Sequence, residues 1–278
     1  RPELDIARLP ADVWPEGCDT AALQQRLAPL FTSHFSRERW LVTYGESEVE
    51  VALDRGEVEA NDLREPLHEI ELELKRGKLA DVLALAAELA KMDGLRLGSL
   101  SKAARGYWLS QGKPQQPVRP LPVLQAKPKA TVEEGMQAAL SLALQHWQYH
   151  EELWLRGEPG AQQAVLEALE TVRQTFSLFG ALVPRKASSQ LRQKLTSLAE
   201  ALEKERLDAQ AFCYSSPWLD AQLSLSSWLI SAGWRPFVVG KNADRMQGSF
   251  KRFADIMLGR VAADLKETFG TIRSEERR

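Results

Sequence analysis

The chain has 278 residues, of which 44% are hydrophobic and 27% are charged, with a formal net charge of −2. This length accommodates about two domains, and the composition is that of a soluble globular protein. The balanced charge argues against a nucleic-acid-binding protein, and the absence of a long apolar run argues against a membrane span.

The chain contains two cysteines, Cys18 and Cys213, which lie far apart in the sequence. We expect them to be free thiols in a reducing compartment rather than part of a disulfide framework. No signal peptide is recognisable, so we expect a cytoplasmic protein. The sequence begins at Arg1 instead of methionine, and we expect it to lack its natural N-terminus.

The first elements are expected to be a short helix and a β-hairpin. Residues 20–27 are predicted to form the helix, with Thr20 or Asp19 as its cap. Residues 35–42 and 48–54 are predicted to form the two strands of the hairpin. A polar loop is expected over residues 56–64.

The stretch from Glu65 to Gly77 reads EPLHEIELELKRG, and its period of two predicts a strand. Glu69, Glu71 and Glu73 would share one face, with aliphatic residues on the other. Two interpretations stay open. The glutamates lie in water on a half-buried sheet, or they face the polar lumen of a closed barrel, where such oxygens suit Mg²⁺ or Mn²⁺.

A helix over residues 78–91 is expected to follow, because its leucines lie on or beside one face. Lys102 and Arg105 come later, in a segment predicted to lie near a strand end. Residues 112–130 contain five prolines and four basic residues without an acid. Neither a helix nor a central strand tolerates this density of proline, so the segment is predicted to be a semi-rigid linker between two domains.

The remaining sequence predicts an antiparallel helical bundle with short connections. The expected helices cover residues 133–155, 161–183, 187–206, 218–230 and 242–269.

Two features of the helical half bear on function. His146 and His150 have the i,i+4 spacing of metal ligands, although they lack the HExxH order, so the spacing alone is weak evidence for a metal site. Several basic residues gather around the second helix and its turn, which is consistent with a phosphate-binding face or with an ordinary solvated surface. These residues are Arg173, Arg185, Lys186 and Arg192.

The runs VEVALDRGEVEA, EPLHEIELELKRG and LRLGSLSKAARGY resemble the C-terminal half of the CYTH domain, the triphosphate tunnel metalloenzyme family. The runs ETVRQTFSLFGALVPRKASSQLR and SFKRFADIML resemble the CHAD domain. The order of the two domains is similar to that of bacterial inorganic triphosphatases. The resemblance implies an α+β chain with a CYTH portion at residues 1–111, a linker at 112–130 and a CHAD-like bundle at 131–278. The CYTH portion would belong to an antiparallel eight-stranded β-barrel, or tunnel.

The resemblance also implies metal-dependent hydrolysis of inorganic tripolyphosphate to pyrophosphate and phosphate. Mg²⁺ or Mn²⁺ would be held by carboxylates matching Glu69 and Glu71, together with Glu73 and Asp54. The phosphates would be held by residues matching Arg37, Arg39 and Lys102, and catalysis would use Lys102 and Arg105. Longer polyphosphate is a further partner that the resemblance implies, bound by Arg173, Arg185, Lys186 and Arg192.

The sequence departs from the family pattern in two places. The N-terminal ExExK strand of the CYTH family would lie before residue 1, so we expect this chain alone not to turn over substrate. Leu166 and Glu170 stand among the positions where CHAD domains carry histidine and arginine. The alternatives are a catalytically incomplete polyphosphate-binding adaptor, or a related activity on thiamine triphosphate or a nucleoside triphosphate. The physiological substrate and the oligomeric state do not follow from the sequence.

Overall fold

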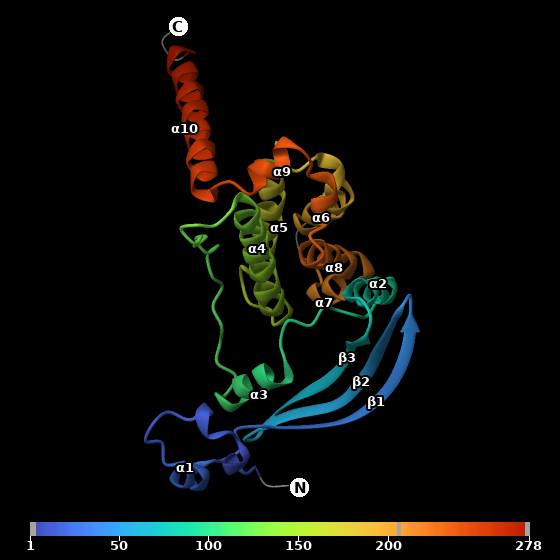
Figure 1. Ribbon diagram of the computed structural model, residues 1–278. Coiled ribbons are helices and arrows are strands. Elements are labelled where there is room, and N and C mark those ends of the chain that lie inside the picture. Colours follow the sequence, from blue (N-terminus) through green and yellow to red (C-terminus); the bar gives the residue numbers. More distant parts are fainter. Residues whose placement is uncertain (1–3, 205–206, 276–278) are drawn as a thin grey trace. The chain divides into compact units, whose positions relative to one another are not determined.

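A computed structural model describes residues 4–204 and 207–275, with side chains up to residue 268 (Figure 1). Inter-residue contacts divide the chain into two compact units, and the division crosses the β-sheet. The first unit comprises Arg1–Trp40, Val51–Glu71 and Leu100–Pro114, and the second comprises Leu41–Glu50, Leu72–Ser99 and Gln115–Arg278.

The sheet has three strands in the order β1 (Thr32–Tyr44), β2 (Ser47–Ala60) and β3 (Leu63–Arg76). Two-residue connections join neighbouring strands, so the strands are antiparallel. Within the described residues this sheet is open, with β1 and β3 at its edges. A sheet followed by helices confirms the α+β fold class, and an open three-stranded sheet agrees with a portion of a barrel.

The prediction of a loop over residues 56–64 is wrong, because β2 continues through this stretch to Ala60. Gly56 allows the neighbouring strand to approach closely, since a Cβ atom there would lie 1.9 Å from the carbonyl oxygen of His34. Val58 and Ala60 are buried and continue the alternation of the strand. The turn is confined to two residues and begins at Asn61, whose φ of 53° is left-handed.

The prediction that Lys102 lies near a strand end is also wrong, because this residue begins helix α3 (Lys102–Ser110). The hydroxyl of Ser101 caps the helix by accepting a hydrogen bond from the amide of Ala104 at 3.0 Å. The helix packs on one face of the sheet through a small apolar cluster. Its buried members are Val58, Ala60, Leu67 and Leu109, with Phe31, Leu63 and Trp108 packed against them.

The first unit also contains the expected short helix, α1 (Thr20–Arg26), capped by Asp19 as predicted. In the second unit, helix α2 (Leu79–Leu89) occupies the stretch predicted to be helical. Both cysteines are free thiols, and Cys213 is buried.

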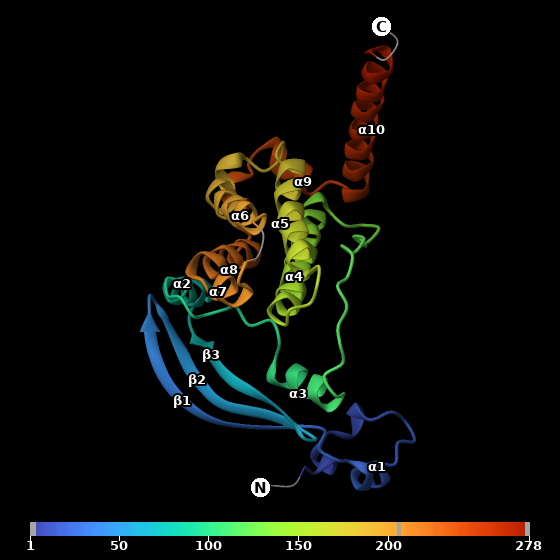
Figure 2. The ribbon, with the colours of Figure 1, turned by 180° about the vertical axis from the view of Figure 1, so that it is seen from behind.

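The helices after residue 130 form a bundle in which α4 and α5 run side by side (Figures 1 and 2). Trp147, Trp218 and Trp234 are fully buried in its core. Because their ring surfaces leave water, these tryptophans contribute strongly to the packing of the bundle. The helices are α4 (Val132–Leu155), α5 (Ala161–Leu178), α6 (Ser189–Leu202), α7 (Ala209–Cys213), α8 (Ser216–Ile230), α9 (Lys241–Met246) and α10 (Phe250–Glu275).

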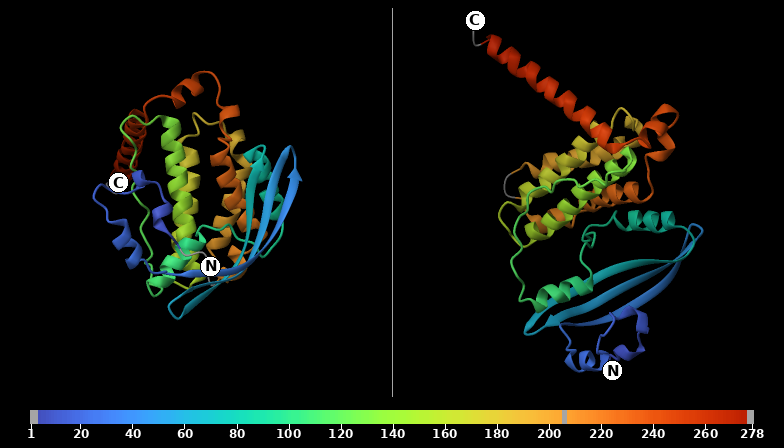
Figure 3. Two further views of the ribbon diagram at one scale, coloured as in Figure 1. Left: turned by 60° about the horizontal axis from the view of Figure 1, so that its bottom comes forward. Right: turned by 60° about the vertical axis from the view of Figure 1, so that its left-hand side comes forward.

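Three expectations about the bundle need correction. Helix α5 ends at Leu178 rather than at residue 183, and the short helix α7 was not predicted. The single helix expected over residues 242–269 is two helices, α9 and α10, separated at Gly248. Helix α10 extends away from the other helices of the bundle (Figure 3). Among the described residues, no helix combines the length and apolar character needed to cross a membrane.

Candidate functional site

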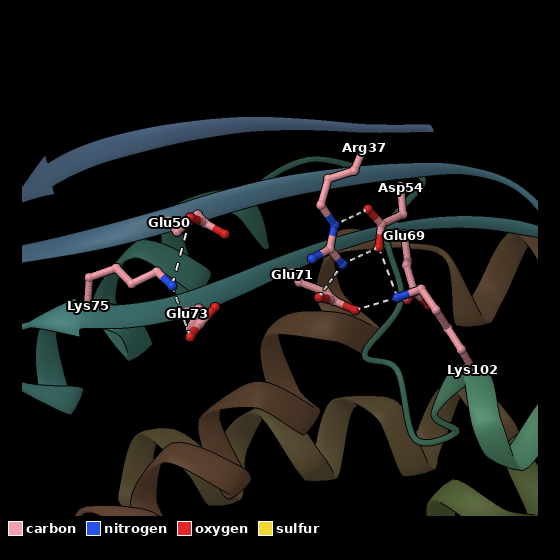
Figure 4. Close-up of polar contacts among 8 residues, drawn as sticks. All are labelled: Arg37, Glu50, Asp54, Glu69, Glu71, Glu73, Lys75 and Lys102. Carbon is pink, nitrogen blue, oxygen red and sulfur yellow. Dashed lines mark hydrogen bonds and ion pairs between the residues drawn. The ribbon is translucent and has the colours of Figure 1, made fainter. Parts of the chain in front are cut away.

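The side chains of a charged cluster lie within the first unit, on the face of the sheet that α3 covers (Figure 4). Strand β1 supplies Arg37, β2 supplies Asp54, and β3 supplies Glu69 and Glu71, while α3 supplies Lys102 and Arg105. The period of two along each strand brings these strand residues to one face. We call these six residues the charged cluster.

Arg37 joins the three strands through two carboxylates. Its Nε donates to Oδ1 of Asp54 at 2.6 Å, and its Nη2 donates to Oδ2 of Asp54 at 2.7 Å and to Glu71 Oε2 at 2.9 Å. The hydrogen bond from Arg37 lowers the pKa of Asp54 to about 2, against the opposing effect of burial. Asp54 is therefore an ionised carboxylate at neutral pH although its side chain is fully buried.

Lys102 lies where three carboxylates converge. Its Nζ contacts Oδ2 of Asp54 at 2.9 Å and Oε1 of Glu71 at 2.6 Å, and it also donates to Oε1 of Glu69. Burial acts to lower the pKa of Lys102, but the hydrogen bonds to these carboxylates raise it above its usual value. Arg105 lies 3.6 Å from the remaining oxygen of Glu69. The charged cluster thus contains three cations and three anions, and its formal charges balance.

The burial of the first half of β3 bears on the two interpretations of its alternating sequence. On the aliphatic face Ile70 is 40% exposed, whereas on the charged face Asp54 of the neighbouring strand is fully buried and Glu69 is 21% exposed at its side chain. An ordinary half-buried strand would have the opposite arrangement. Burying charges costs several kcal/mol per ion unless they are paired, so the buried acids at this end of the sheet favour a polar lumen here. Farther along β3 the ordinary arrangement holds, because Glu71 and Glu73 are exposed while Leu72 and Leu74 are half-buried.

The carboxylates of the charged cluster fit a hard divalent cation. One oxygen each from Asp54, Glu69 and Glu71 can be chosen so that all three lie within 4.8 Å of one another. Oxygen ligands of this type suit Mg²⁺ and Mn²⁺. A further carboxylate oxygen of β3, Oε2 of Glu65, is buried without a hydrogen-bond partner.

Two predicted site residues do not join the charged cluster. Glu73 pairs instead with Lys75, at 3.1 Å, and Lys75 lies 3.8 Å from Glu50 (Figure 4). Arg39 is exposed and makes no ion pair within the described part of the chain. Alternation alone does not distinguish Arg37 from Arg39, because both lie on the same face of β1.

Phe35 is a member of the site whose role the sequence reasoning missed. The centre of its ring lies 5.1 Å from Nζ of Lys102 and 5.6 Å from the guanidinium carbon of Arg37, within range for cation–π contacts. Its position two residues before Arg37 places it on the same strand face. The two-residue spacing between Phe35 and Arg37 was a sequence signal for their contact. The contact with Lys102 also requires that α3 covers this face of the sheet.

A second basic site lies in the helical unit, between α5 and α6. Arg173, Arg185 and Arg192 line a cavity of about 590 Å³, which Glu170 and Glu200 also line. Burial lowers the pKa of Arg192, and the positive charges of Arg185 and Arg173 lower it further. Lys186 does not line the cavity, and its Nζ lies 5.8 Å from the ring centre of Phe237.

The two histidines of α4 form a buried pair. The Nδ1 atom of His150 lies 2.8 Å from the carbonyl oxygen of His146, and its Nε2 accepts a hydrogen bond from the amide of Arg119 at 3.0 Å. Burial lowers the pKa of His146 to about 4, and His150 adds to this effect. In the described chain neither histidine belongs to a cluster of three metal-ligating side chains. Both side chains are buried.

The fold and the charged cluster define a protein in which a sheet with a charged, helix-covered face precedes a helical bundle in the sequence. Comparison with known families agrees with this architecture. The CYTH domain matches residues 2–107, and the CHAD domain matches residues 138–278. The chain therefore belongs to the CHAD domain family and carries a CYTH domain before its CHAD domain.

The chain is also similar to a curated protein. The inorganic triphosphatase of Haemophilus influenzae is 40% identical over 83 residues, which make up 30% of this chain and 24% of that protein. The matched stretch thus spans about a quarter of the length of the curated relative.

Proposed function

We propose that the charged cluster is part of a metal-dependent phosphohydrolase site that splits inorganic triphosphate into pyrophosphate and phosphate. The observation that carries this proposal is the convergence of three carboxylates and three cations on the covered face of the sheet. The CYTH match and the similarity to an inorganic triphosphatase support the same reaction.

Asp54, Glu69 and Glu71 are the residues that would hold Mg²⁺ or Mn²⁺. A bound divalent ion would neutralise phosphate oxygens and polarise the phosphoryl group that water attacks. Asp54 is suited to this role because its low pKa keeps it ionised at neutral pH. Glu73 is not proposed as a ligand, because its carboxylate lies outside the group of three whose oxygens converge and contacts Lys75 instead.

The cations of the charged cluster would bind and orient the triphosphate. Arg37 presents a planar guanidinium that matches two phosphate oxygens, and Lys102 and Arg105 lie on the same turn of α3. Arg39 is exposed on the same face of β1 and has no carboxylate partner in the described residues. It is therefore free to bind a phosphate oxygen farther along that face.

The similarity to an inorganic triphosphatase supports the proposal of inorganic triphosphate over other triphosphates. Thiamine triphosphate and nucleoside triphosphates offer the same phosphate oxygens, so the charged cluster alone does not discriminate between them. These compounds are therefore comparison substrates in the test.

The test measures tripolyphosphate binding and phosphate release with Mg²⁺, with Mn²⁺ and with EDTA. It compares this chain with a Glu69→Ala/Glu71→Ala double variant. The proposal predicts metal-dependent binding that the double variant loses. Binding that is indifferent to both metal and variant would contradict it.

Phosphate release then separates an enzyme from an adaptor. Metal-dependent release by this chain would show that further strands are dispensable for turnover or are supplied by a second copy of the chain. Where binding occurs without release, the assay is repeated with an upstream ExExK segment joined to the chain. Release by the longer protein would assign turnover to a complete CYTH domain, and its absence would favour the adaptor.

A second candidate function is the binding of longer polyphosphate by the helical unit. It is favoured by the cavity that three arginines line and by the electrostatics of Arg192, whose pKa is lowered by burial and by two neighbouring arginines, although Arg173 also pairs with Glu170 at 2.7 Å. An anionic chain in that cavity would relieve this repulsion. Arg192→Gln is expected to weaken polyphosphate binding, whereas Lys186→Gln, outside the cavity, is the control and is expected to leave it unchanged.

A further inference from the structure

We propose that Lys102 is a displaceable internal cation, which occupies the position of the divalent ion and makes the protein bind metal and triphosphate together rather than free metal. This inference rests on the proposed metal site. It adds an order to the binding steps, because the free ion must compete with an ammonium group that the chain itself supplies.

The contacts of Lys102 carry the first step. Its Nζ contacts Asp54, Glu69 and Glu71, which are the same three residues whose oxygens converge as a candidate metal site. An ammonium at 2.6 to 2.9 Å from two of these oxygens leaves no room for a second cation among them. The two positive charges would also repel each other strongly at such short range. Divalent metal can therefore enter only if Lys102 leaves.

The charge balance carries the second step. Arg37, Lys102 and Arg105 offset the three carboxylates of the charged cluster. A divalent ion that displaces Lys102 leaves a net positive site and an ammonium without its three partners. A triphosphate bound with the ion supplies anionic oxygens to the ion and to the displaced ammonium. The metal–triphosphate complex therefore balances the charges of the site, whereas the free ion does not. Linkage makes this reciprocal, and triphosphate must raise the affinity for metal by the factor by which metal raises the affinity for triphosphate.

The placement of Lys102 permits the exchange. It is the first residue of α3, and the preceding residues 95–101 contain no helix or strand. Its four-carbon side chain can swing without disturbing the helix, since the cap is made by Ser101. The ring of Phe35, 5.1 Å from Nζ, offers a cation–π surface along its path.

The test measures Mn²⁺ binding by isothermal titration calorimetry in a buffer free of phosphate. Lys102→Met should bind Mn²⁺ at least about tenfold more tightly than the unmodified chain, corresponding to about 1.4 kcal/mol. Lys75→Met is the matched control, because it removes the same charge from a lysine of β3 that contacts other carboxylates. This control should leave the Mn²⁺ affinity unchanged. Equal or weaker binding by Lys102→Met would overturn the proposal.

A second measurement uses the unmodified chain and does not depend on the folding of a variant. Brief reductive methylation, read by mass spectrometry, should label Lys102 slowly without metal, because the ammonium is held by three carboxylates. Saturating Mg²⁺ should speed the labelling of Lys102 several-fold relative to Lys75. Unchanged labelling of Lys102 while Mg²⁺ binds would also overturn the proposal.

The two proposals fail in different ways. If the Lys102 mechanism is wrong but the metal site is right, Mn²⁺ still binds with tripolyphosphate and Glu69→Ala/Glu71→Ala abolishes that binding. If the metal site itself is wrong, the double variant binds Mn²⁺ and tripolyphosphate as the unmodified chain does.

Discussion

Asp54→Asn is the substitution that probes the charged cluster most directly, because it removes one charge with little change of shape. Asp54 accepts hydrogen bonds from Nε and Nη2 of Arg37 and contacts Lys102, and its side chain is fully buried. Removing one partner of a buried ion pair costs about 3–5 kcal/mol. Lys102 keeps its other two carboxylates and Arg37 keeps Glu71, so we expect the lower loss of roughly 2–3 kcal/mol.

Hydrogen exchange read by mass spectrometry localises this loss to the sheet. A loss of that size corresponds to roughly 30- to 150-fold faster exchange of the most protected amides in β2. Glu71→Gln is the matched control, since this carboxylate is 46% exposed and should cost less than about 1 kcal/mol. Equal protection of β2 in Asp54→Asn and in the unmodified chain would refute the reasoning.

The difference in stability between the unmodified chain and Asp54→Asn should depend on pH with a definite sign. The folded-state pKa of Asp54, about 2, lies below its ordinary value of 3.8. The carboxylate therefore contributes stability that is fully present above about pH 4 and is lost as the pH falls toward 2. The difference between the unmodified chain and Asp54→Asn should shrink over this range. A difference that stays constant down to pH 2 would contradict the assigned role of Arg37 in lowering the pKa.

Three further predictions concern the two units. Gly56→Ala should destabilise the sheet by several kcal/mol, because its Cβ would lie 1.9 Å from the backbone oxygen of His34. Hydrogen exchange of the amides of β1 and β2 should therefore become faster. Unchanged exchange rates would contradict the close approach of the two strands. Leu109→Ala should lower the free energy of unfolding by about 2–5 kcal/mol, because removing a fully buried side chain leaves a cavity. Urea unfolding measures this loss, and a loss below about 1 kcal/mol would refute the place of Leu109 in the core. The helical unit should lose stability as the pH falls from 6.5 toward about 4, because burial keeps His146 neutral in the folded state. His146→Phe should flatten this dependence in thermal melts, and an equally steep dependence in the variant would rule out His146 as its cause.

The strands and most of the helices follow from local patterns in the sequence. The alternation around Glu69, Glu71 and Glu73 predicts β3 because the period of two is set by the backbone itself. Thr131 caps α4, and a turn rich in glycine and proline follows Leu155, so local residues mark the bounds of this helix. These signals are confined to neighbouring residues and need no knowledge of the fold.

The convergence of the charged cluster depends instead on tertiary contacts. Cross-strand register pairs Arg37 with Asp54, and nothing in β1 alone favours Arg37 over Arg39. Helix α3 brings Lys102 to a glutamate 33 residues earlier in the chain. The helix has only nine residues and contains a glycine, so its intrinsic propensity is weak and its packing on the sheet decides its structure.

The continuation of β2 through Gly56 also depends on a tertiary contact that the local sequence does not show. A glycine within a polar run favours a loop when the sequence is read locally. In the structure this glycine is required because the neighbouring strand approaches too closely for any side chain. The physical reason for this residue lies on β1, about twenty positions earlier in the chain.

The central claim is that the carboxylates of the charged cluster hold a divalent ion together with a triphosphate. Equilibrium dialysis of the chain against Mn²⁺ and tripolyphosphate tests it, with both components measured on each side of the membrane. We predict that the protein retains Mn²⁺ and tripolyphosphate in equal amounts, and that Glu69→Ala/Glu71→Ala retains neither. Retention of both components by the double variant at the level of the unmodified chain would contradict the account.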